Sequence, residues 1–560
     1  MIGRTRPARP LSDRVRRPLA GAALALLAAC SPSTPPAPQA SATPDAPAGK
    51  QERADTIPWF QGTVEEAFAL AKQERKPVFL YWGAVWCPPC HALRTKLFTR
   101  PEFQARLAST VPVYLDGDTE RAQIWGEKLQ TTGYPTVIVF DADGREVTRI
   151  PSALPFEEYA EVLSRALDAT RPIGEVLADA RAKGPEALPE AELNLLAFHA
   201  WDQDEAIGLD LAARRELFGK LRAGTPVAKK VEKARFLALE LGALATREKD
   251  EAPPELPPAE RAELIAGLHR LLSEAELRRT NLELVLYRAA DVVALLAPQP
   301  GPERAALVEL WNAAARAIEG DESLGVDDRL TALLPQIELE RLGAPEGPGG
   351  EPPPVSRALQ ERVRARVRWA SGLPHDEEEM QGRIDAMAGL LEEAGLESEA
   401  KQLLSEKLGE AAAPYYYTGW LAGIEARTGD KNDAIALYRQ AWQGARQQGS
   451  GAAMTPFRWG SNYLRQATKL TPEATAAIAA DARIVLDDLL ASPDAFSHGN
   501  WARLQSVGAA LEQWQGADPA RVRVVEGIKA QVHAACDRFP AEGEDSAGVR
   551  CRSFLEKAPA

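Results

Sequence analysis

Residues 81–91 read YWGAVWCPPCH, in which two cysteines enclose two prolines directly after a run of aromatic residues. The apolar residues before the motif predict a buried β-strand. Pro88 favours the first turn of a helix, where the missing N–H group costs little. Cysteines at this spacing form half of a metal site or a redox disulfide. The stretch therefore predicts a strand-to-helix junction that carries the chemistry of the chain.

The rest of the sequence favours a redox site over a metal site. There is no second CxxC motif, and the six histidines are scattered without the spacing of metal ligands. At the N-terminus of a helix, unpaired N–H groups favour a thiolate, so Cys87 is the expected exposed nucleophile. Cys90, one turn later and buried, is placed to attack the sulfur of Cys87 and resolve a mixed disulfide. We predict no metal and no cofactor.

The flanking segments predict an α/β unit over residues 57–172, with a mixed sheet flanked by helices. The order α-β-α-α-β-α-β-β-α, in which Pro101 separates the second and third helices, puts helices on both faces of the sheet. The expected elements are helices at 63–75, 90–100, 119–130 and 155–170, strands at 76–84 and 111–118, and a hairpin over 133–150.

WCPPC at a strand-to-helix junction, followed by GYPT (133–136) and a hairpin, resembles the thioredoxin superfamily. Residues 86–107 are most similar to periplasmic members such as the C-terminal domain of the Dsb-type reductase. The resemblance implies an enzyme, a thiol-disulfide oxidoreductase. It also implies a cis peptide bond at Pro135, and substrate contacts from Trp86, Tyr134 and Pro135.

Two features depart from the family pattern. Many members carry a buried Asp on the strand before the motif, but Leu80 or Tyr81 stands at that level here. Proton transfer by a buried carboxylate of that strand is therefore not expected. His91 follows the second cysteine instead of lying between the two, and we predict that it lies at the surface.

Residues 1–29 have the pattern of a lipoprotein signal peptide. Arginines precede an apolar stretch at 19–29 that is short for a membrane span, and the stretch ends in LLAAC (26–30). These letters resemble the bacterial lipobox, so Cys30 is the expected lipid acceptor, with a plain secretory signal as the alternative. Residues 30–56, rich in Pro, Ala and Ser, predict a flexible tether. We expect a lipid-anchored protein on the periplasmic side of the cell envelope.

After the α/β unit, the sequence predicts helix after helix. A Pro/Gly-rich linker at 343–355 separates a helical region at 173–342 from another at 356–560. In the second, residues 393–408 align with 427–442 at a spacing of 34 residues, which resembles the tetratricopeptide repeat. Two similar hairpins in an irregular helical domain are the alternative. This all-α part is expected to fold apart from the redox unit and to bind a protein partner.

Charge and cysteine content limit the remaining possibilities. With a net charge of −14 over 560 residues, the chain is not expected to bind nucleic acid. Five cysteines are too few for a disulfide scaffold. Cys536 and Cys551 are expected to pair in a structural disulfide, because both are otherwise unpaired in an exported chain.

The predicted function is a membrane-anchored oxidoreductase that reduces protein disulfides in the cell envelope and receives electrons from an upstream redox donor. Two alternatives stay open on the sequence alone. In the first alternative, the protein is an enzyme but a disulfide isomerase or oxidase. In the second, it is a non-catalytic protein-binding scaffold lipoprotein.

Overall fold

The structure, a computed structural model, describes residues 57–556 except 153, 170, 248–253, 346, 348–351, 449–453, 542 and 544–545. The predicted signal peptide, the tether and Cys30 lie outside the described residues. Among the helices that are described, none combines the length and apolarity that a membrane crossing requires.

The α/β unit is built on a four-stranded sheet with the strand order β2-β1-β3-β4. β1 (Val78–Gly83) pairs in parallel with β2 (Val111–Asp116) and antiparallel with β3 (Thr136–Phe140). β4 (Glu146–Ile150) pairs antiparallel with β3 and forms one edge. Every residue of β1 is buried, because helices cover both faces of the sheet. The mixed sheet and the predicted order of elements are confirmed.

The helices divide between the two faces of the sheet. α1 (Val64–Glu74) and α4 (Glu120–Leu129) pack on the face that carries Leu80, while α2, α3 and α5 pack on the face that carries Tyr81. A capping box between Thr63 and Glu66 begins α1. The helices on the second face are α2 (Pro88–Leu93), which a π-helical turn (Arg94–Phe98) continues, α3 (Pro101–Leu107) and α5 (Phe156–Asp168).

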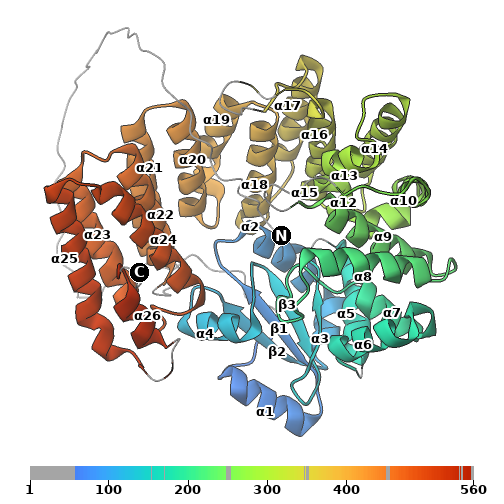
Figure 1. The fold of residues 1–560 in the computed structure, drawn as a ribbon, viewed down its shortest axis with the longest axis horizontal. Helices are drawn as coiled ribbons and strands as arrows, with labels where there is room; N and C mark the ends of the chain where they lie inside the picture. Colours follow the sequence, from blue (N-terminus) through green and yellow to red (C-terminus); the bar gives the residue numbers. More distant parts are fainter. Residues whose placement is uncertain are drawn as a thin grey trace, which may run out of the picture.

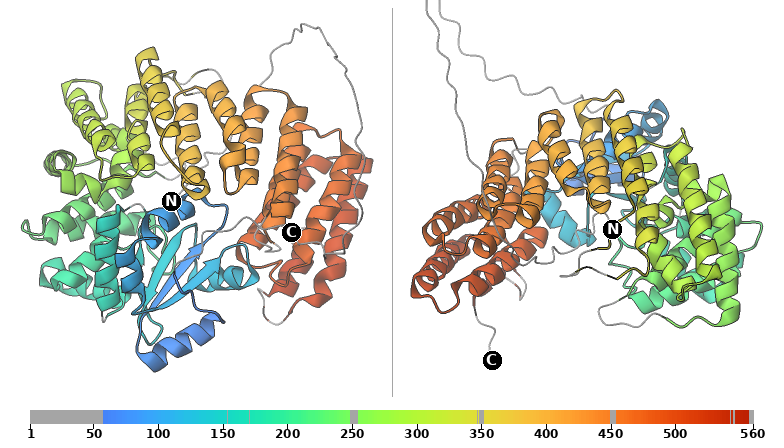
Figure 2. Two further views of the ribbon diagram at one scale, coloured as in Figure 1. Left: turned by 180° about the vertical axis from the view of Figure 1, so that it is seen from behind. Right: turned by 90° about the horizontal axis from the view of Figure 1, so that it is seen from above.

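The rest of the chain is an arc of helices that curves around the α/β unit (Figure 1). The arc leaves the unit after α5, passes over α2 at its middle, and returns to the unit beside α4 (Figures 1 and 2). No strand occurs in the described residues after 172. The first half of the arc comprises α6 (Ile173–Lys183), α7 (Glu190–Ala197), α8 (Leu211–Gly224), α9 (Lys230–Ala245), α10 (Pro258–Ser273), α11 (Ala275–Arg279), α12 (Leu282–Tyr287), α13 (Ala289–Leu296), α14 (Pro302–Gly320), α15 (Val326–Thr331) and α16 (Leu334–Arg341).

The second half of the arc stacks pairs of longer helices. Gly395 adopts a left-handed conformation (φ +73°) in the turn between α18 and α19, and Gly429 occupies the corresponding turn between α20 and α21. The two segments that align in sequence are thus equivalent hairpins; their assignment to the tetratricopeptide repeat stays a prediction. The helices are α17 (Arg357–Ser371), α18 (Glu377–Glu393), α19 (Glu397–Lys407), α20 (Pro414–Thr428), α21 (Lys431–Gln448), α22 (Met454–Leu470), α23 (Thr475–Leu490), α24 (His498–Gln515), α25 (Pro519–Ala535) and α26 (Ala547–Ser553).

The apolar cores do not stop at the predicted domain boundaries. One core runs from Ile57 through the second face of the sheet and on to Ala243, so α5 and α7 to α9 bury side chains in common. Another joins Ile337 to Val355 and Val363 across the Pro/Gly-rich linker. The boundaries at 172 and 343–355 stay predictions, but neither separates two hydrophobic cores.

We expect a fragment of residues 57–172 to unfold at a temperature about 10 °C or more below that of residues 57–247. The shorter fragment uncovers apolar side chains of the shared core, and each large one contributes about 1.5–3 kcal/mol when buried. Thermal unfolding followed by circular dichroism measures the difference. Equal melting temperatures would show that the boundary at 172 separates two independent units.

Candidate redox site

The cysteine pair lies at the start of α2, as the motif predicted. Cys87 is the N-cap residue in an extended conformation, and its Sγ accepts a hydrogen bond of 3.2 Å from the backbone N–H of Cys90. Pro88 and Pro89 occupy the first two helical positions. The structure places Cys87 and Cys90 in a disulfide with their Cα atoms 5.2 Å apart. A thiolate at Cys87 therefore lies where helix N–H groups stabilise negative charge.

Both sulfur-bearing residues are buried, Cys87 with 2% and Cys90 with 1% of its surface exposed. Burial of Cys90 was expected, but the prediction that Cys87 is exposed is wrong. Cys87 belongs to the apolar core on the second face of the sheet, and α18, α20 and α22 of the helical arc pack on α2 and on the neighbouring Trp86.

Trp86 is the centre of these contacts. Its ring stacks on Tyr416 of α20, at 6.0 Å between ring centres and 15° between planes, and meets the edge of Trp459 of α22 at 5.3 Å. Its backbone oxygen accepts a hydrogen bond of 3.1 Å from Nε2 of Gln381 on α18. The residue next to Cys87 is thus held by three helices that lie roughly 300 or more residues further along the chain.

The other two predicted substrate-binding residues lie beside Trp86. The Tyr134–Pro135 peptide bond is cis, as the family resemblance implied, and the Tyr134 ring meets Trp86 at 5.6 Å between centres. The carbonyl oxygen of Pro135 accepts a hydrogen bond of 3.4 Å from Gln203, which lies between α7 and α8. The structure therefore brings Trp86 and the Tyr134–Pro135 pair together, although their role in substrate binding stays a proposal.

Asp118 is a site residue that the sequence analysis missed. Only 1% of it is exposed, and its carboxylate accepts hydrogen bonds from Trp86 Nε1 (2.8 Å), Thr455 Oγ1 (2.8 Å) and Arg458 (2.7 Å to Nη2). Burial alone favours the protonated acid, but Arg458 and these donors outweigh it and lower the pKa of Asp118. The sequence did contain a signal for Asp118. It follows β2 just as the motif follows β1, and the two strands are parallel, so both segments lie at the same end of the sheet.

His91 is buried, with 4% exposure, so its predicted surface position is wrong. Its Nε2 lies 2.5 Å from the carbonyl oxygen of Val85, and its Nδ1 lies 3.7 Å from Glu378 of α18. The side chain that follows the second cysteine is covered because α18 packs directly on α2.

The comparisons with known proteins agree with this geometry. Residues 64–167 match the family model described as a thioredoxin-like domain. This part of the chain is a thioredoxin-like domain.

Curated relatives resemble the same part of the chain. A "Thiol:disulfide interchange protein DsbD" of Vibrio vulnificus is 34% identical over 110 residues, which cover 18% of this chain and 18% of the relative. A protein of the same name from Yersinia enterocolitica is 37% identical over 105 residues, 17% of this chain and 18% of the relative. The chain thus matches less than a fifth of the length of these relatives. A solved structure named "DsbH Oxidoreductase" aligns with a TM-score of 0.19 and 22% identity, over 22% of this chain and 93% of its own.

The thioredoxin-like domain lacks an acid on β1, where Leu80 and Tyr81 are both buried, as the sequence shows. The helical arc carries a buried carboxyl, Asp385, that contacts Tyr416. Burial raises the pKa of Asp385 on α18 to about 7, and the charge of Asp327 acts in the same direction. A hydrogen bond of 3.3 Å from Tyr416 lowers the pKa and offsets part of this rise. Since Tyr416 stacks on Trp86, this carboxyl is one side chain removed from the motif. Among the described residues, no group of His, Cys, Asp and Glu is arranged to hold a metal ion.

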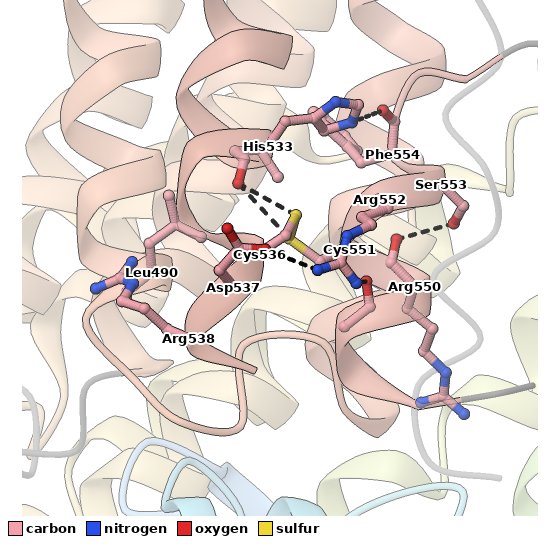
Figure 3. The surroundings of a disulfide bond; sticks show 12 residues. Leu490, His533, Cys536, Asp537, Arg538, Arg550, Cys551, Arg552, Ser553 and Phe554 are labelled. Carbon is pink, nitrogen blue, oxygen red and sulfur yellow. Dashed lines mark hydrogen bonds and ion pairs between the residues drawn. A yellow bond between two sulfur atoms is a disulfide. The ribbon is translucent and has the colours of Figure 1, made fainter. Parts of the chain in front are cut away.

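The second cysteine pair lies in the bundle formed by the C-terminal helices α22 to α26. Cys536, in a short turn after α25, and Cys551, in α26, form a disulfide with their Cα atoms 5.5 Å apart (Figure 3). Both residues are almost fully buried, at 1% and 0% exposure, within the core of the bundle. The bond ties the last helix of the chain to α25.

Replacing both Cys536 and Cys551 by alanine should lower the free energy of unfolding by about 3 kcal/mol, because the open chain gains entropy when this loop is no longer closed. Denaturant unfolding of the oxidised proteins measures the loss. The reactivity of the Cys87–Cys90 pair serves as the control and should not change. Stability equal to that of the unmodified protein would show that the bond is not structural.

Proposed function

We propose that this protein is a thiol-disulfide oxidoreductase of the cell envelope that reduces disulfides in other proteins. The observation that carries the proposal is the position of Cys87, at the N-cap of α2 and one helical turn from Cys90. That arrangement stabilises a thiolate and keeps a second thiol within reach of it. The similarity of the thioredoxin-like domain to thiol:disulfide interchange proteins supports the same chemistry.

In the proposed reaction, the Cys87 thiolate attacks one sulfur of a substrate disulfide. The substrate S–S bond breaks, its other sulfur leaves as a thiolate that takes up a proton, and a mixed disulfide with Cys87 remains. Cys90 then loses its proton and attacks the Cys87 sulfur, which releases the second substrate thiol. Two electrons have passed to the substrate, and the Cys87–Cys90 disulfide is reduced again by a dithiol donor that becomes a disulfide itself.

Substrate contacts are assigned to Trp86, Tyr134 and Pro135. We assign the backbone of Tyr134, next to Pro135, as the part that pairs with an extended segment of a substrate. Trp86 lies on the other side of Tyr134 and supplies an apolar wall. The helical arc is assigned a role in binding a protein partner.

The Cys87 and Cys90 variants should behave differently in the native host. Cys90→Ser leaves attack intact but blocks resolution, so mixed disulfides through Cys87 should accumulate with the natural substrates. Cys87→Ser removes the nucleophile and is the matched control. Non-reducing gels should show adducts above the monomer for Cys90→Ser alone. If neither variant forms adducts and both keep wild-type activity, the pair is not catalytic, and a scaffold function replaces the proposal.

The location of the protein follows from the expected lipid at Cys30. Cys30→Ser should move the protein from the membrane fraction to the soluble fraction, because stable anchoring depends on the attached acyl chains. Fractionation of cells that express each form measures this. An unchanged membrane fraction for Cys30→Ser would contradict the anchor without affecting the redox chemistry.

A further inference from the structure

The surface assigned to substrate binding is occupied by the protein's own helical arc. The guanidinium group of Arg458, on α22, lies 4.6 Å from the centre of the Trp86 ring and 5.5 Å from that of Tyr134. Its Nη2 also donates a hydrogen bond of 3.1 Å to the Tyr134 hydroxyl. A substrate that contacts Trp86 and Tyr134 therefore competes with α22 for the same groups.

Helix α18 covers the motif from a second direction. Gln381 donates to the backbone oxygen of Trp86, and its own Oε1 accepts from the N–H of Ala413, so the amide is fixed at both ends. Gly382 lies so close to α2 that a β-carbon there would be 3.6 Å from the Pro88 oxygen and 3.8 Å from the Ala92 β-carbon. The parts of α18, α20 and α22 that contact the motif are called the cover below.

The two ends of the arc are attached to the thioredoxin-like domain by different forces. At the start of the arc, side chains such as Leu196, Phe198 and Trp201 share one apolar core with the domain. At the far end, α22 is attached through the buried Arg458–Asp118 ion pair, with 2.7 Å between Nη2 and Oδ1, and through aromatic contacts to Trp86. Separating a continuous apolar core costs far more than releasing a polar joint. At the far end, α24 also packs on α4, and Trp86 packs against an apolar core whose buried residues all belong to the arc. The end that carries α22 thus shares less apolar surface with the domain than the start of the arc does, and it is the end expected to move.

We propose that the cover closes the redox site against substrates, and that the Arg458–Asp118 ion pair is the latch that holds it closed. A disulfide reaches Cys87 only when α22 leaves Trp86 and Tyr134. This regulation rests on the proposed function, because it assumes that Cys87–Cys90 is the reactive pair.

The latch is the buried ion pair that joins α22 to the domain, so we expect it to stabilise the closed position of α22 more than the exposed ion pairs do. Only 16% of the Arg458 side chain and 1% of the Asp118 side chain are exposed. The Lys96–Asp327 and Arg550–Glu127 pairs also join the arc to the domain, but each has a partner that is 42% or 43% exposed. The Arg94–Glu378 pair is more buried, with 17% of each side chain exposed, but it holds α18 and not α22. Exposed pairs contribute little, whereas breaking a buried one leaves an uncompensated charge in the closed state. Loss of Arg458 thus favours the open state selectively.

The test measures how fast dithiothreitol reduces the Cys87–Cys90 disulfide in the oxidised, full-length protein, read by mass-mapped alkylation of the new thiols. Each disulfide reduced converts one dithiothreitol to its cyclic disulfide. Arg458→Met should speed the reaction by about tenfold or more, because the open state becomes more populated. The matched control is Arg439→Met, which removes an arginine from another buried carboxylate, Asp481 at 2.7 Å, inside the arc. It should react within about twofold of the unmodified protein.

Thermal unfolding of each variant checks that it is folded. If Arg458→Met does not fold, Thr455→Val takes its place, because it removes one donor to Asp118 at nearly constant volume. A folded latch variant that reacts no faster than the unmodified protein overturns the proposal, as does an equal acceleration by Arg439→Met. Failure of the proposed function gives a different result: the latch variant is reduced faster, yet the reduced protein does not reduce insulin disulfides.

Discussion

A carboxylate with only 1% of its surface exposed must be paired, and the pairing of Asp118 determines how this molecule is put together. Asp118 follows β2, at the sheet edge where the redox motif begins. Its partners are Trp86 of the motif and Thr455 and Arg458 of α22. The Asp118 carboxylate therefore links the indole of Trp86, next to Cys87, to a helix more than 300 residues further along the chain. The redox site is completed by the helical arc and is not a property of the thioredoxin-like domain alone.

The same interdependence appears on β4, the edge strand next to β3. Arg149 of β4 is fully buried, and its guanidinium donates to the carbonyl oxygens of Leu129 and Gln203 and to Glu146. Asp204 lies 3.8 Å from it. Since Gln203 and Asp204 belong to the helical arc, the sheet depends on the arc to satisfy a buried cation. Composition separates the two parts of the chain, whereas packing and buried charges join them.

Local signals in the sequence were sufficient for the fold of the α/β unit. The capping box at Thr63, the hairpin over 133–150 and the apolar strand patterns each depend on residues a few positions apart, and each is present in the structure. The burial of His91 could not be predicted in this way, because α18, which packs on it, lies almost 300 residues further along the chain. No pattern around Arg458 indicates a partner 340 residues earlier. Asp118 was within reach, since parallel pairing of β1 and β2 places it beside the motif.

The most direct test of the redox assignment is an equilibrium titration of the intact protein in glutathione buffers, with each cysteine followed by alkylation and mass mapping. We predict that Cys87 and Cys90 are oxidised and reduced together as one two-electron couple, with a reduction potential in the range that glutathione buffers set. We also predict that Cys536 and Cys551 stay oxidised over the same range. Cysteines 87 and 90 that stay in one state throughout, or that titrate independently of each other, would contradict the redox assignment.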